Sequence, residues 1–124
     1  MKKIIVVDDE KDVEILYRQQ FRKAIKSEEI NFVFAFSGLE ALSIMEELKE
    51  DDFMMFTDIN MPGMTGLELL EKVKVQYPET KVYVVSAYDL KEYQESAKKL
   101  GAEAFIPKPI DFAVIKDKIV KNDL

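Results

Sequence analysis

Short apolar runs recur along the chain, and polar residues end each of them abruptly. Four runs cover residues 4–7, 53–56, 82–85 and 104–106, and a fifth extends from Phe32 to Phe36. The runs are continuously apolar rather than alternating, which is typical of strands buried on both faces of a parallel sheet. The pattern therefore predicts five central strands.

Segments with helical periodicity separate these runs. Their apolar residues trace five helix faces: Val13, Leu16, Phe21 and Ala24; Ala41, Met45 and Leu48; Gly66, Leu69 or Leu70, Val73 and Tyr77; Leu90, Tyr93, Ala97 and Leu100; Phe112, Ile115 and Ile119. We expect Ser37 and Asp111 to cap the second and last helices, and Gly101 to follow the fourth.

Regular strand–helix alternation produces a parallel sheet covered by helices on both faces. We predict one α/β domain, residues 1–124, with a doubly wound (βα)5 three-layer architecture and strand order 2-1-3-4-5. The first and third strands then lie side by side at the switch point, where ligands bind in such folds.

Chemically active residues follow the ends of four predicted strands: Asp8 and Asp9, Asp58, Ser86 and Ala87, and Lys108. The carboxyl ends of parallel strands share one edge of the sheet, so we expect these residues to form one pocket. Taken singly, each has a simpler role as a helix cap, turn former or surface residue. Their shared placement favours an acidic site for a divalent cation, balanced by the lysine.

Asp58 is the foremost candidate for chemistry. The Pro62-Gly63 pair that follows it predicts a turn, which would present the carboxylate. A carboxylate can attack a phosphoryl group, but the two anions repel each other. A divalent ion held by Asp9 and Asp58 would offset that repulsion, as phosphoryl transfer requires.

Composition narrows the chemistry of this pocket. The chain has no cysteine and no histidine, so a metal must be held by oxygen ligands, which favours Mg²⁺, Mn²⁺ or Ca²⁺. The net charge of −6 argues against direct binding of nucleic acid. No apolar stretch has the length of a membrane span or signal peptide, so we expect no membrane partner and a cytoplasmic location.

Together these motifs resemble the receiver domain of two-component response regulators, a flavodoxin-like family that includes chemotaxis regulators. The resemblance covers essentially the whole chain, with the motifs in the family's order and spacing. It rests on five motifs: Val7-Asp8-Asp9-Glu10, Asp58 to Gly66, Ser86-Ala87, Gly101-Ala102 and Lys108-Pro109.

The resemblance implies that Asp58 accepts a phosphoryl group from a phosphohistidine of a sensor histidine kinase or a histidine phosphotransfer protein. It implies that Mg²⁺, for which Mn²⁺ could substitute, is bound by Asp9, Asp58 and the backbone carbonyl of Asn60, with Asp8 acting mainly through water. The chain would be a signalling phosphoacceptor rather than an enzyme, and would catalyse only its own phosphorylation and dephosphorylation.

The resemblance also implies how the phosphoryl group is held and sensed. Ser86, the amide of Ala87 and Lys108, which would precede a cis bond to Pro109, would contact the phosphoryl oxygens. Ser86 and Phe105 would form a switch in which Phe105 turns inward, at a position where many members carry tyrosine.

The readout face would be the fourth helix, fifth strand and fifth helix, including Lys91, Tyr93, Lys98 and Lys99. Its partner would be a downstream protein target or effector domain, and a homodimer formed on phosphorylation is compatible with the family. Tyr88, two residues after Ser86, would shield the phosphoryl group from water.

Two other classes of function stay open on sequence alone. One is a pseudo-receiver, an interaction module that is never phosphorylated. The other is a small phosphohydrolase that uses an aspartyl phosphate, although Asn60 stands where an acid–base aspartate would be needed. A flavin or nucleotide role is weaker, because an acidic pair rather than a glycine-rich loop follows the first strand.

Overall fold

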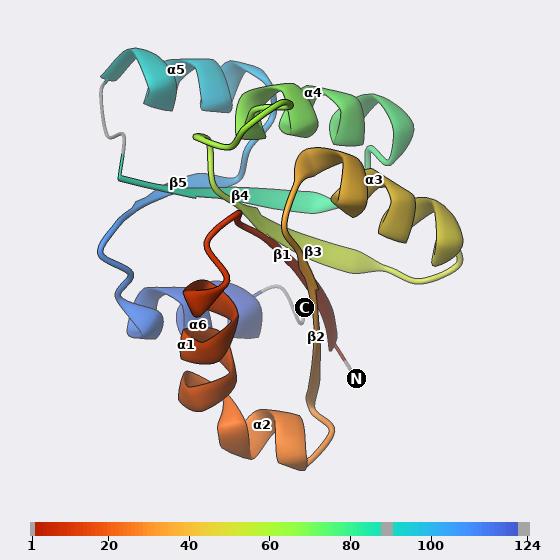
Figure 1. The fold of residues 1–124 in the computed structure, drawn as a ribbon, viewed down its shortest axis with the longest axis vertical. Helices are drawn as coiled ribbons and strands as arrows, with labels where there is room; N and C mark the ends of the chain where they lie inside the picture. Colours follow the sequence, from red (N-terminus) through yellow and green to blue (C-terminus); the bar gives the residue numbers. More distant parts are fainter. Residues whose placement is uncertain (1, 88–90, 122–124) are drawn as a thin grey trace.

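A five-stranded parallel sheet forms the centre of the molecule (Figure 1). The computed structural model describes residues 2–87 and 91–121. Its strands are β1 (Lys2–Val7), β2 (Ile30–Ala35), β3 (Phe53–Thr57), β4 (Lys81–Ser86) and β5 (Ala104–Pro107). They pair in the order β2-β1-β3-β4-β5, with every pairing parallel. The predicted fold class and strand order are confirmed.

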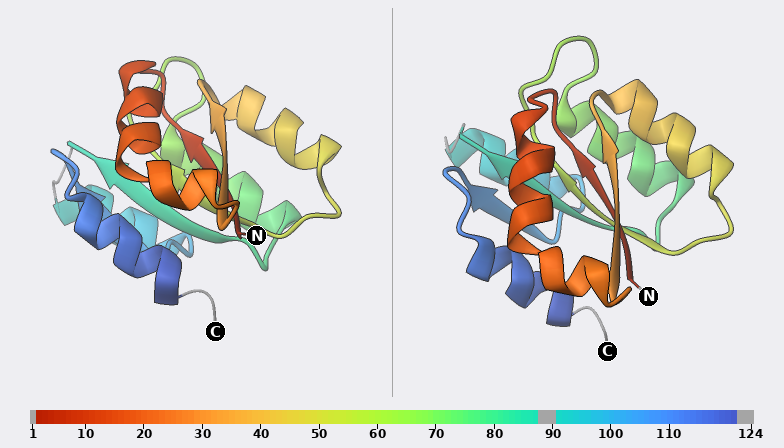
Figure 2. Two further views of the ribbon diagram at one scale, coloured as in Figure 1. Left: turned by 90° about the horizontal axis from the view of Figure 1, so that it is seen from below. Right: turned by 60° about the horizontal axis from the view of Figure 1, so that its bottom comes forward.

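Helices cover both faces of this sheet (Figures 1 and 2). They are α1 (Asp12–Gln20), α2 (Arg22–Lys26), α3 (Gly38–Glu47), α4 (Gly66–Gln76), α5 (Lys91–Lys99) and α6 (Phe112–Lys121). The figures place α3, α4 and α5 on one face, and α1, α2 and α6 on the other. The three layers follow from strands that are apolar on both sides.

Alternate residues of each strand supply the two halves of the core. Ile5 and Val7 of β1 belong to the cluster beneath α3, α4 and α5, whereas Ile4 and Val6 belong to the cluster beneath α1 and α6. This division follows from the two-residue period of a strand. Both faces are therefore buried, and the polar residues that end each strand emerge at a common edge.

The first helix is where the structure departs from the sequence prediction. One helix was expected through Val13, Leu16, Phe21 and Ala24, but the structure has α1 and α2, which Phe21 separates with φ −111° and ψ 21°. Leu16 is also wrong as a core residue, because it is 44% exposed whereas Tyr17 is 1% exposed. Tyr17 is four residues from both Val13 and Phe21, so these three share a face.

The predicted helix ends mostly agree with the structure. The Ser37 side chain accepts a hydrogen bond from the Glu40 amide, and the Asp111 side chain accepts one from the Ala113 amide. Gly101 has φ +100° just after α5, a left-handed conformation that suits glycine. Leu48 follows α3 and is 37% exposed, so it was wrong as part of that helix face. Leu90 lies outside the described residues.

None of the helices in the described part of the chain has the length and apolar character needed to cross a membrane.

Candidate functional site

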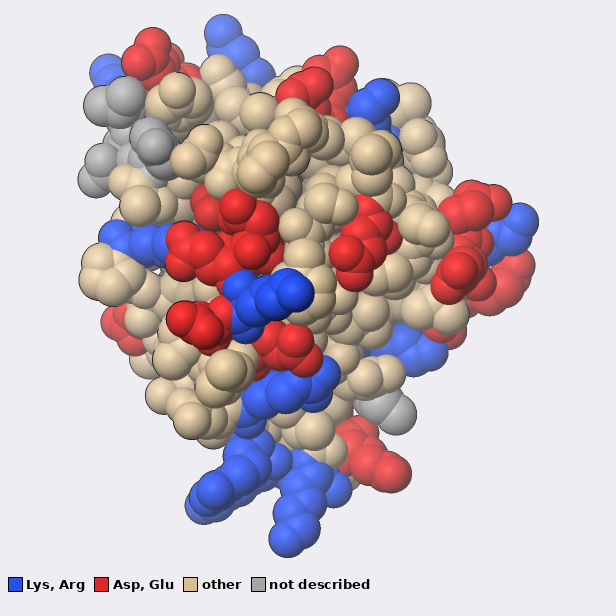
Figure 3. All heavy atoms as spheres, in the orientation of Figure 1, with Lys and Arg blue, Asp and Glu red and all other residues tan. Residues whose placement is uncertain are grey.

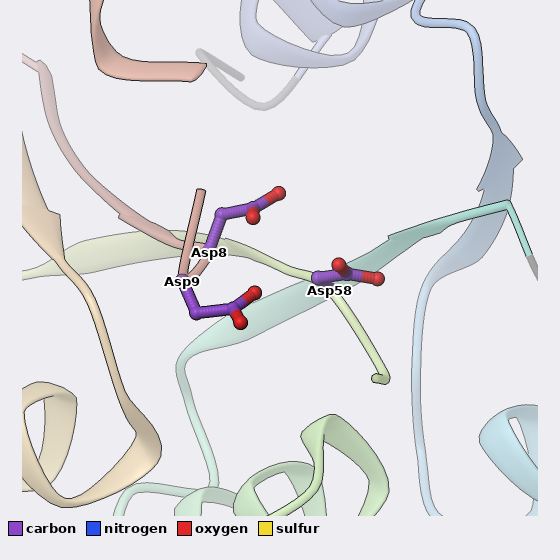
Figure 4. A group of neighbouring side chains, drawn as sticks. All are labelled: Asp8, Asp9 and Asp58. Atoms are coloured by element: carbon purple, nitrogen blue, oxygen red, sulfur yellow. The ribbon is translucent and has the colours of Figure 1, made fainter. Parts of the chain in front are cut away.

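Three carboxylates meet at the carboxyl edge of the sheet (Figure 4). Asp8 and Asp9 follow β1, and Asp58 follows β3, the neighbouring strand. Each offers a carboxylate oxygen, and these oxygens all lie within 4.8 Å of one another. Asp8 and Asp58 are buried, while Asp9 is exposed. The parallel register of β1 and β3 thus joins residues that lie about fifty positions apart, as the sequence predicts.

Asp8 and Asp58 are held in matching ways. Oδ1 of Asp8 accepts a hydrogen bond of 2.9 Å from the Glu10 amide, and Oδ1 of Asp58 accepts one of 2.8 Å from the Ile59 amide. The second oxygen of each faces Lys108, whose Nζ lies 2.8 Å from Asp8 Oδ2 and 3.3 Å from Asp58 Oδ2. Each buried carboxylate is therefore fixed by one backbone donor and one shared ammonium.

Lys108 is held in its charged form by this arrangement. Burial lowers the pKa of its ammonium, but the hydrogen bonds and charges of Asp8 and Asp58 outweigh burial, so the pKa is raised above its usual 10.5. Three carboxylates still face one ammonium. The excess negative charge and the all-oxygen donor set fit a hard divalent cation.

The segment after Asp58 is anchored closely against α4. The amide of Gly66 donates a 2.8 Å hydrogen bond to the carbonyl of Ile59. A Cβ at Gly66 would lie 1.8 Å from the backbone oxygen of Asp58, so only glycine allows this approach. Thr65 caps α4 in a capping box with Glu68. This packing orients the backbone that carries Asp58.

The remaining candidate residues surround the same edge. Ser86 is fully buried at the end of β4, and its carbonyl accepts a hydrogen bond of 3.0 Å from the Lys108 amide. Ala87 follows it and is exposed, as is Asn60 after Asp58. Phe105 is half-buried on β5, in register with Val84 of β4. These residues occupy the edge or strands on which the sequence placed them.

Two further expectations have different outcomes. The peptide bond between Lys108 and Pro109 is cis, as the resemblance implies. Tyr88, which was expected to shield the phosphoryl group, lies outside the described residues.

Tyr17 is a neighbour of the site that the sequence analysis missed. Its side chain is 1% exposed, and burial together with the charge of Asp8 raises the pKa of its hydroxyl. Its four-residue spacing from Val13 and Phe21 was the available signal. Tyr17 therefore connects α1 to the acidic edge as a neutral, buried group.

Comparison with known proteins identifies the family. A sequence model described as "Response regulator receiver domain" matches residues 4–120. The chain belongs to this family. Phosphoryl transfer is the chemistry general to receiver domains, which are signalling proteins rather than classical enzymes.

Individual relatives agree with this assignment. The receiver domain is 32% identical over 120 residues to sporulation initiation phosphotransferase F of Bacillus subtilis, covering 97% of this chain and 92% of that protein. It is 32% identical over 119 residues to a cyclic di-GMP phosphodiesterase of Thermotoga maritima, covering 96% of this chain but only 30% of that protein. Receiver sequences like this one thus occur both as most of a protein and as a small part of one.

A solved structure supports the fold and the type of site. The crystal structure of the response regulator TrrA from Thermotoga maritima, in complex with Mg²⁺ and BeF, superposes with a TM-score of 0.77. The two share 27% sequence identity, and the match covers 98% of both chains.

Proposed function

We propose that Asp58 is the phosphoacceptor of a two-component signalling switch. Its donor is a phosphohistidine of a sensor histidine kinase or a histidine phosphotransfer protein. The observation that carries the proposal is the pair of buried carboxylates, Asp8 and Asp58, that share Lys108 beside Asp9. Residues 1–124 act as a single domain in this proposal, and the cytoplasm is its location, where kinases of this class present their phosphohistidine.

Transfer begins with attack of an Asp58 carboxylate oxygen on phosphorus, while the phosphorus–nitrogen bond to the donor histidine breaks. The histidine leaves as neutral imidazole after taking up a proton. Lys108 already lies 3.3 Å from Asp58 Oδ2, so its ammonium can follow charge onto the phosphoryl oxygens. The hydroxyl of Ser86 and the amide of Ala87, at the end of the neighbouring strand, are the further donors in this proposal.

The oxygen ligands at this edge suit Mg²⁺, with Mn²⁺ as a substitute. Asp9, Asp58 and the backbone carbonyl of Asn60 would hold it, with Asp8 acting mainly through water. When bound, the ion neutralises the carboxylates and the phosphoryl oxygens. The protein would then catalyse only its own phosphorylation and dephosphorylation.

The signal would leave through Ser86 and Phe105. Inward movement of Ser86 toward the phosphoryl group frees space that the half-buried ring of Phe105 can enter. Phe105 also lines a surface depression of about 440 Å³ beside α5, together with Lys91, Gln94 and Lys98. A downstream protein target or an effector domain would bind this face, and phosphorylation would favour a homodimer through it. Neither nucleic acid nor a membrane is proposed as a direct partner.

Intact-protein mass spectrometry after incubation with acetyl phosphate tests the proposal. We expect one phosphoryl adduct on the wild type with Mg²⁺, and none without Mg²⁺ or on Asp58→Asn. Asp52→Asn, which changes an exposed acid before β3, is the matched control and should retain the adduct. An adduct that survives on Asp58→Asn would overturn the assignment of Asp58. No adduct on the wild type, even from a phosphohistidine donor, would indicate a pseudo-receiver.

A further inference from the structure

A second concavity lies at the opposite edge of the sheet from the three aspartates. It encloses about 550 Å³ where the end of α1, α2, the start of β2 and α6 meet. The described residues that line it are Gln19, Gln20, Phe21, Arg22, Lys23, Ala24, Glu29, Ile30, Lys116, Ile119 and Val120. We call this the α2–α6 pocket. None of these residues belongs to the phosphoacceptor site.

The break between α1 and α2 forms one wall of this pocket. At Phe21 the chain leaves α1, and α2 sets off at a steep angle to it (Figure 2). The backbone stays bonded across the break, because the Phe21 amide donates to the Tyr17 carbonyl and the Ile25 amide donates to the Phe21 carbonyl. The ring of Phe21 packs against Phe32 and Phe112, which holds the break in place.

The floor of the pocket is apolar. Phe21, Ile30 and Ile119 are each at most 8% exposed and present the edge of the core that lies beneath α1 and α6. Val120, on α6, is 68% exposed and adds apolar surface at the opening. This floor could cover an apolar group and remove it from water.

The rim is cationic, although the chain as a whole is acidic. Arg22 and Lys23 come from α2, and Lys116 from α6 places its ammonium 5.6 Å from the centre of the Phe21 ring. Figure 3 shows lysine and arginine side chains gathered over these helices, at the bottom of the view. Within the described residues, no salt bridge includes any of these three cations. Their charge is therefore available to a ligand.

We propose that the α2–α6 pocket binds a small amphiphilic anion, with its apolar body on the Phe21–Ile119 floor and its carboxylate or phosphate group at the Arg22–Lys116 rim. The volume lies within the range of about 300–1,000 Å³ that is usual for small-molecule pockets. Charge complementarity selects an anion, since three cations and one acid, Glu29, line the pocket. The enclosure by two helices and a strand favours a compact ligand over a flat membrane surface.

Titration of the wild-type protein with octyl phosphate, followed by amide chemical shifts, tests this proposal. We expect saturable binding, with the shifts concentrated at α2, α6 and the start of β2. Octyltrimethylammonium, which has the same apolar body and the opposite charge, should bind at least tenfold more weakly. Inorganic phosphate, which lacks the apolar body, should also bind at least tenfold more weakly. Equal binding of either control probe would overturn the proposal.

Charge variants make the test specific to the pocket. Arg22→Glu and Lys116→Glu should each weaken octyl phosphate binding at least tenfold. Lys72→Glu changes the net charge equally on the exposed face of α4 and should leave the affinity within twofold. Glu29→Gln should strengthen binding, because it removes the acid that lines the pocket. Equal weakening by Lys72→Glu, or weaker binding by Glu29→Gln, would show only general attraction to charge.

Discussion

The two edges of the sheet handle charge in opposite ways. At the carboxyl edge, Asp8 and Asp58 are buried and share Lys108, so each charge has a bonded partner. At the amino edge, the cations of the α2–α6 pocket lie over apolar and aromatic surface and have no carboxylate partner among the described residues. Buried charges must be paired in the folded state, whereas exposed cations can stay solvated until an anion binds.

This contrast predicts that the two edges depend on different parts of the chain. The carboxyl edge relies on close backbone approach and long-range pairing between strand ends. The amino edge relies on aromatic packing around a helix break. Four changes separate these contributions.

Gly66→Ala should have the largest effect and should damage the carboxyl edge. Its Cβ would lie 1.8 Å from the Asp58 oxygen and 2.7 Å from the Ile59 Cα, and backbone atoms cannot rotate aside. We expect urea denaturation to show a loss of roughly 4 kcal/mol or more in the free energy of unfolding.

Gly63→Ala is the matched control for that change. Gly63 has φ +76°, but nothing lies within 4 Å of an added Cβ. Only the left-handed backbone is strained, so we expect a loss of about 1–2 kcal/mol. Equal losses for the two variants would show that the close approach at Asp58 is not what constrains Gly66.

Phe21→Ala should damage the amino edge instead. Phe21 is 4% exposed and contacts Tyr17, Phe32 and Phe112, so its removal should lower the free energy of unfolding by about 3 kcal/mol. Amide chemical shifts should change around α1, α2 and α6. Those of Asp58 and Ile59 should stay in place, and large changes there would contradict the independence of the two edges.

Asp9→Asn should remove most of the stabilisation by Mg²⁺. For the wild type, Mg²⁺ at ten times its dissociation constant should raise the free energy of unfolding by about 1.4 kcal/mol. The variant loses a carboxylate of the proposed ligand set, so denaturation curves with and without Mg²⁺ should nearly coincide. Asp12→Asn, an exposed acid in the first turn of α1, should respond to Mg²⁺ as the wild type does.

Tyr17→Phe should have the smallest effect and should appear only in alkali. Burial and the charge of Asp8 raise the pKa of Tyr17 in the folded protein above its usual 10.0. The unfolded chain then releases this proton first as the pH rises, so the wild type loses stability above pH 10. Between pH 8 and 10.5 the wild type should lose about 0.8 kcal/mol more than the variant. Parallel losses in urea denaturation would show that Tyr17 ionises normally in the fold.

Much of the site could be predicted because the fold brings strand ends together. Continuous apolar runs predict parallel strands, and parallel strands share a carboxyl edge, so Asp8, Asp9, Asp58 and Lys108 could be grouped before any coordinates were known. Individual hydrogen bonds could not be predicted in the same way. The sharing of Lys108 between Asp8 and Asp58 depends on side-chain positions that only the packed strands define.

The sequence by itself determined the fold class, the strand order and the edge that carries the acidic residues, because hydrophobic periodicity is a local property of the chain. Only the tertiary structure decided that Phe21 interrupts the first helix and that Tyr17, rather than Leu16, faces the core. Those outcomes depend on aromatic contacts with Phe32 and Phe112, which lie on β2 and α6. Contacts between distant segments can outweigh local helical preference, and here they also create the α2–α6 pocket.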